Sequence, residues 1–190
     1  HNKAFDFALQ TVYNLPNATK EKIMTEGKID TQILIEAVSL YGVSEQDAKA
    51  KMDQAVKVMA EHFFKKADEG EYIPMPGVVD LLSDLENQGL PLGVLTGNVE
   101  DIGWEKLKRA GVRDFFSFGA FGSSAFKRVD LIEGARKKAE QTLGIEVPMH
   151  SLIIVGDSPL DIACARAGNI EVIAVGTGHY KSHELSGADL

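Results

Sequence analysis

An alternation of short apolar segments with helix-length segments, from Pro74 to the end of the chain, most constrains the fold. Four segments have the length and apolar content of buried strands, and amphipathic segments that end at glycine separate them. The expected strands are residues 92–95, 117–121, 152–155 and 172–175. Strands that alternate with helices need crossover connections and form a parallel sheet covered on both faces. We therefore expect an α/β fold with a doubly wound parallel sheet.

The first part of the chain follows a different pattern. From His1 to about residue 72, apolar residues recur at the three- and four-residue spacing of amphipathic helices, and no strand is expected. We expect a helical domain at residues 1–73 and an α/β core domain at residues 74–190. The chain has 190 residues, 44% of them hydrophobic, which is enough for one sizeable core and a smaller satellite.

Composition excludes several classes of partner. The formal net charge is -8 and no long basic stretch occurs, so nucleic acid is not an expected partner. Cys164 is the single cysteine, which rules out an intrachain disulfide and a cysteine-based metal site. A reducing, cytoplasmic location is therefore expected. No apolar segment reaches the roughly 18 residues that cross a membrane, so no membrane partner is expected. The sequence leaves the oligomeric state open.

The loop after the third expected strand carries two carboxylates. In open α/β sheets, ligands bind outside the carboxyl ends of the strands. Asp157 and Asp161 lie four residues apart at this position and could converge on one cation. Magnesium prefers such hard oxygen ligands. The alternative is local, with Asp157 or Ser158 as a helix N-cap and Asp161 as a first-turn acid.

Two further strand ends carry groups suited to phosphate. Thr96, Gly97 and Asn98 combine a hydroxyl, a glycine and an amide directly before a helix, which is typical of an anion-binding corner. The alternative is an ordinary turn in which Asn98 caps the helix. Lys127 or Arg128 could supply the cation that holds phosphoryl oxygens, or could form a solvated basic pair. Because all three loops are expected on one edge of one sheet, together they predict a phosphoryl-transfer site.

These motifs resemble those of the haloacid dehalogenase superfamily of hydrolases, in particular its phosphoglycolate-phosphatase-like branch with a helical cap. Residues 96–98 match the second motif of that family, and residues 156–161 match its fourth, metal-binding motif. Residues 121–131 resemble the branch in which arginine replaces the third-motif lysine. The resemblance implies that Arg128, rather than Lys127, holds phosphate, and that residues 1–73 form the cap.

The resemblance also implies an activity, which is Mg²⁺-dependent hydrolysis of a small phosphorylated metabolite through an aspartyl-phosphate. Asp157 would bind the metal, and Asp161 would ligate or support it. The residues implied to hold the transferred group are Thr96, Gly97, Asn98 and Arg128. The family nucleophile belongs to an Asp-x-Asp-Gly-Thr motif ahead of the cap. Phe5-Asp6-Phe7 lacks the rest of that motif, so Asp6 is expected on a helix surface and the nucleophile upstream of His1.

Two alternatives remain open from the sequence. The chain could be a non-catalytic domain that binds metal and phosphate, which the missing nucleophile motif favours. It could also be a metal-independent haloacid dehalogenase, although the acidic pair Asp157 and Asp161 counts against that function.

Overall fold

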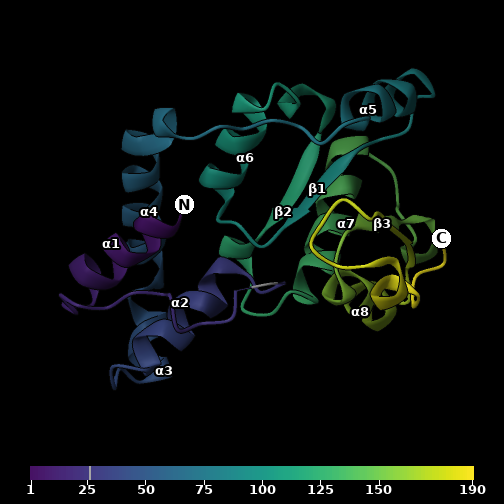
Figure 1. Ribbon diagram of the computed structural model, residues 1–190. Coiled ribbons are helices and arrows are strands. Elements are labelled where there is room, and N and C mark those ends of the chain that lie inside the picture. The colour runs from purple at the N-terminus through teal and green to yellow at the C-terminus, as the bar shows by residue number, and fades with distance from the viewer. Residues whose placement is uncertain (26) are drawn as a thin grey trace. The chain divides into compact units, whose positions relative to one another are not determined.

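The computed structural model describes residues 1–25 and 27–190 (Figure 1). The chain divides into two compact units, and each is described by itself. The first comprises His1–Ile73, Thr96–Arg113 and Phe121–Phe126, and the second comprises Pro74–Leu95, Asp114–Ala120 and Lys127–Leu190. The first unit thus includes two segments that follow strands. The division into domains 1–73 and 74–190 stays a prediction.

The first unit is helical in its amino-terminal part, as the apolar spacing predicts. It contains α1 (Asn2–Val12), α2 (Asp30–Ser39), α3 (Glu45–Ala50) and α4 (Met52–Lys66), then a 3₁₀ turn, η1 (Ala67–Glu69). Helices α1 and α4 lie side by side (Figure 1). Their facing apolar stripes bury Phe5, Leu9, Met59 and Phe63. Later in the chain, α6 (Glu100–Arg109) and a second 3₁₀ turn, η3 (Gly122–Ser124), belong to the same unit.

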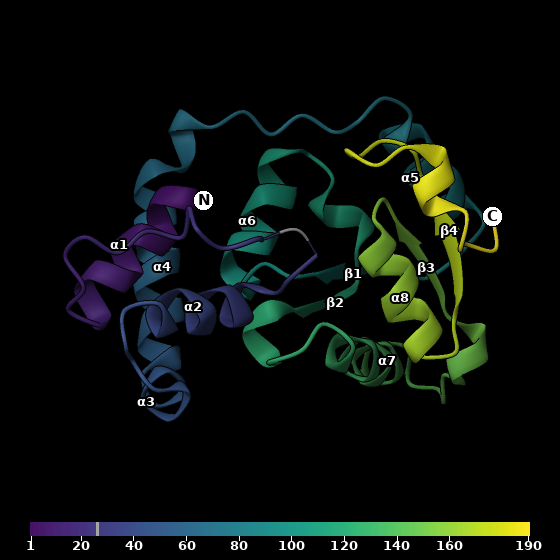
Figure 2. The same cartoon turned by 60° about the horizontal axis from the view of Figure 1, so that its bottom comes forward.

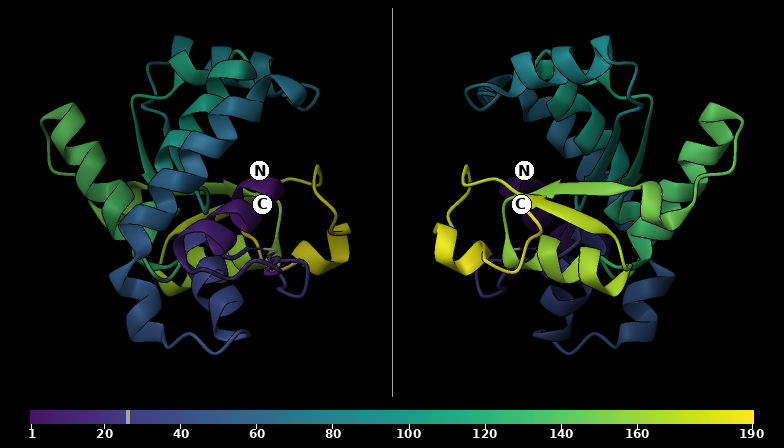
Figure 3. Two further views of the ribbon diagram at one scale, coloured as in Figure 1. Left: turned by 90° about the vertical axis from the view of Figure 1, so that its left-hand side faces the viewer. Right: turned by 90° about the vertical axis from the view of Figure 1, so that its right-hand side faces the viewer.

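The second unit is built around a pair of parallel strands, β3 (Ile153–Gly156) and β4 (Glu171–Ala174). Their register places Ile153 opposite Glu171 and Gly156 opposite Ala174. Helix α8 (Pro159–Ala167) packs against both strands (Figures 2 and 3). The unit also contains α5 (Val78–Asn87), α7 (Asp130–Leu143), η4 (Met149–Ser151) and η5 (Ser182–Leu185). A further 3₁₀ turn, η2 (Arg113–Phe115), joins α6 to the next strand.

The remaining strands, β1 (Gly93–Thr96) and β2 (Phe118–Phe121), pair with each other. All four strands lie close to their expected ranges, and the α/β class with parallel strands is confirmed. The expectation of one continuous sheet is not met among the described residues, where the strands form two separate two-stranded sheets. The exposure of β3 agrees with this pairing. Ile153 and Val155 are each 56% exposed, whereas a sheet covered on both faces would bury them. No described helix combines the length and hydrophobicity that membrane crossing requires.

Candidate functional site

The six residues predicted to form the site fall into two groups, one in each unit. Thr96, Gly97 and Asn98 belong to the first unit. Arg128, Asp157 and Asp161 belong to the second. Each group follows the end of a strand, as the sequence predicts, and each has a geometry of its own.

In the second unit, Asp161 lies in the first turn of α8 and is only 7% exposed. Ser158 is the N-cap of that helix, and its hydroxyl accepts a hydrogen bond from the Asp161 N–H at 3.2 Å. The same hydroxyl donates to Asp161 Oδ2 at 2.7 Å, while Arg128 forms an ion pair with Asp161 Oδ1. Both carboxylate oxygens of Asp161 are therefore engaged, and the local capping interpretation holds for Ser158. Lys127, the alternative cation, is exposed.

Asp157 differs from Asp161 because its side chain is exposed on the loop between β3 and α8. The loop after β4 borders it closely. A Cβ added to Gly178 would lie 2.5 Å from Asp157 Oδ2, so only glycine fits there without displacing the carboxylate. Sequence analysis assigned no role to Gly178, and the available signal was its position after the last strand.

These groups can be compared with what a magnesium ion needs. No cluster of three or more His, Cys, Asp or Glu side chains suited to a metal occurs in residues 1–25 and 27–190. Magnesium is often held by one or two carboxylates together with waters and substrate phosphate. Asp157 offers an exposed hard oxygen, whereas Asp161 is occupied by Ser158 and Arg128. The residues present thus fit a Mg²⁺ ion to which Asp157 would be the protein ligand, while Asp161 is already engaged by Ser158 and Arg128.

In the first unit, the side chains of Thr96 and Asn98 contact each other. Thr96 Oγ1 accepts hydrogen bonds from Asn98 Nδ2 at 2.8 Å and from the Asn98 backbone N–H at 3.3 Å. Asn98 Oδ1 accepts a hydrogen bond from Lys106 Nζ at 2.6 Å. The N-cap of α6 is Val99, and no side chain of its own segment caps this helix. The alternative in which Asn98 caps the helix is therefore wrong.

A carboxylate from another part of the chain occupies the capping position. Asp30 Oδ2 accepts the Val99 N–H at 2.9 Å and lies 3.1 Å from His1 Nε2. Asp30 is 4% exposed, and this burial raises its pKa to about 7, against the opposing effects of the Val99 hydrogen bond and the Lys106 charge. Sequence analysis assigned no role to Asp30 or to Lys106. Neither residue has a local sequence signal. The partner of Asp30 is Val99, 69 residues away, and Lys106 lies on α6, eight residues after its partner Asn98.

Glycine at position 97 permits a close backbone approach. A Cβ added there would lie 2.5 Å from the Lys28 carbonyl oxygen and 3.1 Å from Ile29 Cα. The backbone N–H of Asp30 also donates to the Gly97 carbonyl oxygen at 2.7 Å. The sequence predicts that Gly97 lets a phosphate approach, and the structure adds that segment 28–30 lies against the same residue. Lys28 itself forms an ion pair with Glu36.

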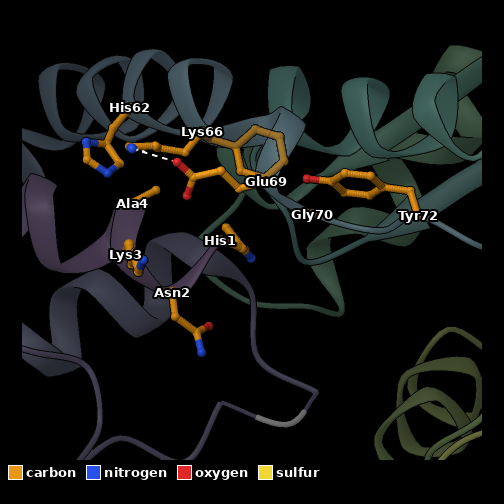
Figure 4. Close-up of a pocket in the computed structure, with 10 residues that line it drawn as sticks. His1, Asn2, Lys3, Ala4, His62, Lys66, Glu69, Gly70 and Tyr72 are labelled. Atoms are coloured by element: carbon orange, nitrogen blue, oxygen red, sulfur yellow. Dashed lines mark hydrogen bonds and ion pairs between the residues drawn. The ribbon is translucent and has the colours of Figure 1, made fainter.

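A pocket of about 410 Å³ lies elsewhere in the first unit, between the start of α1 and the end of α4 (Figure 4). Lys66 and Glu69 form an ion pair at its wall, at 2.6 Å. His1, Lys3, His62 and Tyr72 also line it. None of the six predicted site residues does, so this pocket is separate from both strand-end loops.

Comparison with known proteins identifies the family. The profile of the family described as haloacid dehalogenase-like hydrolase matches residues 6–175. A phosphoglycolate phosphatase of Mesorhizobium japonicum is 27% identical over 135 residues, which is 70% of this chain and 57% of the relative. A phosphoglycolate phosphatase of Chromobacterium violaceum is 35% identical over 119 residues, covering 60% of this chain and 50% of the relative. The chain thus spans about half the length of the curated relatives it matches.

Solved structures show the same fold. A hydrolase from Pseudomonas syringae superposes with a TM-score of 0.64 at 19% identity, covering 99% of this chain and 82% of that one. CbbY from Rhodobacter sphaeroides, in complex with phosphate, superposes with a TM-score of 0.62 at 18% identity, covering 98% and 85%. Together with the match over residues 6–175, these findings show that the chain belongs to the haloacid dehalogenase-like hydrolase family.

Proposed function

We propose that the full-length protein is a Mg²⁺-dependent phosphatase that hydrolyses a small phosphorylated metabolite through an aspartyl-phosphate. The observation that carries this proposal is the loop after β3, where Asp157 is exposed and, four residues later, buried Asp161 forms an ion pair with half-buried Arg128. The names of the relatives from Mesorhizobium japonicum and Chromobacterium violaceum support it and make phosphoglycolate the first substrate to test.

In the proposed site, Asp157 would hold the magnesium ion, and Asp161 keeps Arg128 in place through their ion pair. A bound magnesium ion would neutralise charge on the phosphoryl oxygens. Thr96, the Gly97 N–H, Asn98 and the Arg128 guanidinium hold the transferred group by hydrogen bonds. The aspartate expected upstream of His1 attacks phosphorus and displaces the substrate's alcohol oxygen, which leaves as the protonated alcohol. Water then hydrolyses the acyl phosphate to inorganic phosphate and regenerates the aspartate.

The test measures release of inorganic phosphate from phosphoglycolate and other small phosphomonoesters by the full-length protein, with Mg²⁺ and with EDTA. EDTA should abolish turnover, and Asp157→Asn should lower it about 100-fold or more, because a lost charge at a transition-state site costs that much. Asp84→Asn is the matched control, since Asp84 is an exposed aspartate on α5 of the same unit. Turnover that survives both EDTA and Asp157→Asn would show that the metal role is wrong.

A second candidate is a domain that binds metal and phosphate without hydrolysis. The observation that favours it is that residues 1–190 contain no Asp-x-Asp-Gly-Thr segment, the motif that carries the family nucleophile. Calorimetric titration of the full-length protein with Mg²⁺ and inorganic phosphate separates the two functions. Binding without turnover of any phosphomonoester supports this candidate, and turnover excludes it.

The third candidate, a metal-independent haloacid dehalogenase, is disfavoured by the acidic loop, because a site without metal has no need of exposed Asp157 near buried Asp161. Release of halide from a 2-haloacid in the presence of EDTA would reverse that judgement.

A further inference from the structure

A chain of hydrogen bonds in the first unit runs from Lys106 on α6 to the hydroxyl of Thr96. Lys106 Nζ donates to Asn98 Oδ1 at 2.6 Å, and Asn98 Nδ2 donates to Thr96 Oγ1 at 2.8 Å. The protonated lysine amine has donors only, so the end of the Asn98 amide that faces it must be the oxygen. Lys106 therefore determines which way the amide of Asn98 is turned.

The orientation of Asn98 decides what the Thr96 hydroxyl can do. Oγ1 accepts from Asn98 Nδ2 and also from the Asn98 backbone N–H at 3.3 Å, which fills its two acceptor positions. Its own proton is then directed to a further acceptor, and phosphoryl oxygens are acceptors only. If the amide were reversed, its oxygen would accept the Thr96 proton and remove this donor.

The surroundings of Lys106 act on its pKa in both directions. Burial lowers its pKa, while the negative charge of Asp30 opposes that shift and Lys20 adds to it. The His1 ring also faces it, with Nδ1 at 3.4 Å from Nζ. A competing explanation is structural, in which Lys106 serves only to offset the charge of buried Asp30. The experiment must therefore separate an effect through Asn98 from an effect on the fold.

We propose that Lys106 is a positioning residue that, through Asn98, turns the Thr96 hydroxyl into a hydrogen-bond donor for the transferred phosphoryl group. The inference rests on the proposed phosphatase function. It adds Lys106, which lies on α6 eight positions after Asn98, to the residues that determine phosphoryl binding.

The test is a double-mutant cycle in the full-length protein, with phosphoglycolate or the best phosphomonoester as substrate. Lys106→Met should lower kcat/KM at least about tenfold, and Lys106→Arg should restore it to within about threefold, because Arg keeps the donor. In a Thr96→Val background, Lys106→Met should cause no further loss, since the hydroxyl that it positions is gone. Lys108→Met is the matched control, an exposed lysine on the same helix that should leave kcat/KM unchanged.

Several outcomes would overturn the inference. An equal loss from Lys106→Met with and without the Thr96 hydroxyl, or failure of Lys106→Arg to rescue a folded protein, would mean that Lys106 has only a structural role. If Lys106→Met does not fold, Asn98→Asp replaces it in the cycle, because aspartate keeps the acceptor for Lys106 but cannot donate to Thr96. A loss in Asn98→Asp that is additive with Thr96→Val would also contradict the inference.

A second readout separates failure of the inference from failure of the proposed function. If the wild-type protein hydrolyses no phosphomonoester, the proposed function is wrong. Lys106 is then judged by the side-chain amide resonance of Asn98 in ¹⁵N–¹H spectra. The resonance should move in Lys106→Met and stay in place in Lys108→Met. An unmoved resonance in Lys106→Met would overturn the inference without any assay of turnover.

Discussion

The loop after β1 and the loop after β3 both hold polar groups at a strand end. They differ in where the hydrogen-bond and ion-pair partners of those groups come from. After β3, Ser158 and Asp161 bond to each other within one helical turn, and Arg128 joins them from another segment. After β1, the helix end is capped by Asp30, which is 69 residues away in sequence from its partner Val99. An arrangement of side chains that are neighbours in the sequence can be predicted from that sequence, whereas an arrangement that joins distant segments cannot.

The two loops also differ in how a buried carboxylate is compensated. Asp161 faces the guanidinium of Arg128, a full opposite charge. Asp30 accepts a backbone N–H, and burial raises its pKa to about 7 in spite of nearby Lys106. Removing a carboxylate from water is costly unless a charge or several hydrogen bonds replace the water. The first unit therefore has a charge that is sensitive to pH near neutrality.

At a fixed pH, the largest expected effect is on stability and comes from a comparison of two glycines. Gly97 lies in the loop after β1, and Gly178 lies in the loop after β4, next to Asp157 of the loop after β3. Gly97→Ala should lower the free energy of unfolding by about 3 kcal/mol, because the new methyl group meets the backbone of Lys28 and Ile29. Gly178→Ala should cost less than about 1 kcal/mol, because the group it meets is the movable side chain of Asp157, and should reduce Mg²⁺-dependent activity instead.

Urea denaturation and phosphatase assays check both substitutions. Gly176→Ala is the control, since a Cβ there meets nothing within 4 Å. Wild-type stability in Gly97→Ala would mean that segment 28–29 does not stay against Gly97 in solution.

The next largest effect concerns the cation of the loop after β3. Arg128→Ala should lower phosphatase activity about 100-fold and the free energy of unfolding by about 2 kcal/mol, because it leaves buried Asp161 without its opposite charge. Lys127→Ala, the adjacent exposed cation, should change stability by less than about 0.5 kcal/mol. Equal losses of activity in the two variants would favour the alternative in which Lys127 holds the phosphate.

An effect that develops only as pH rises is expected from the pH dependence of Asp30. Its pKa is raised in the folded state to about 7, so folding favours the protonated form. Its contribution is complete below the unfolded pKa near 4 and is lost as pH rises through 7. Between pH 4 and pH 8, wild type should lose about 4 kcal/mol of unfolding free energy relative to Asp30→Asn, which stays neutral, because the pKa of Asp30 is about three units higher in the folded state and each unit corresponds to about 1.4 kcal/mol.

Denaturant titrations across this pH range measure the difference. Asp53→Asn, at an exposed position on α4, should follow the wild-type curve. Parallel curves for wild type and Asp30→Asn would contradict a raised pKa of the buried Asp30 carboxyl in the first unit.

The smallest effect concerns Cys164, which is 6% exposed on α8 and whose Sγ contacts the Arg128 carbonyl oxygen at 3.6 Å. Burial raises the pKa of this thiol, so its reaction with a disulfide reagent at pH 8 should be about tenfold or more slower in the folded than in the urea-unfolded protein. Folded and unfolded protein reacting at the same rate would show that the loop after β3 opens freely.

Much of the fold was predictable because it depends on local patterns. The four strands and their flanking helices follow from apolar runs and from glycines such as Gly144, which ends α7 with a positive φ of 67°. The division of the strands into two pairs was not predictable, because pairing depends on which strand edges meet. The prediction that residues 96–98, Arg128, Asp157 and Asp161 form one site stays a prediction.

What the sequence by itself determined was the placement of Thr96, Asp157 and Asp161 at strand ends, because strand length, glycine and capping residues act over a few neighbouring positions. Only the tertiary structure decided which of these groups are engaged. In that structure, Asp161 forms an ion pair with Arg128, Asp157 is exposed, and Asp30 accepts the Val99 N–H at the start of α6. The physical reason is that burial and charge compensation depend on every segment packed around a residue, including segments that are remote in the chain.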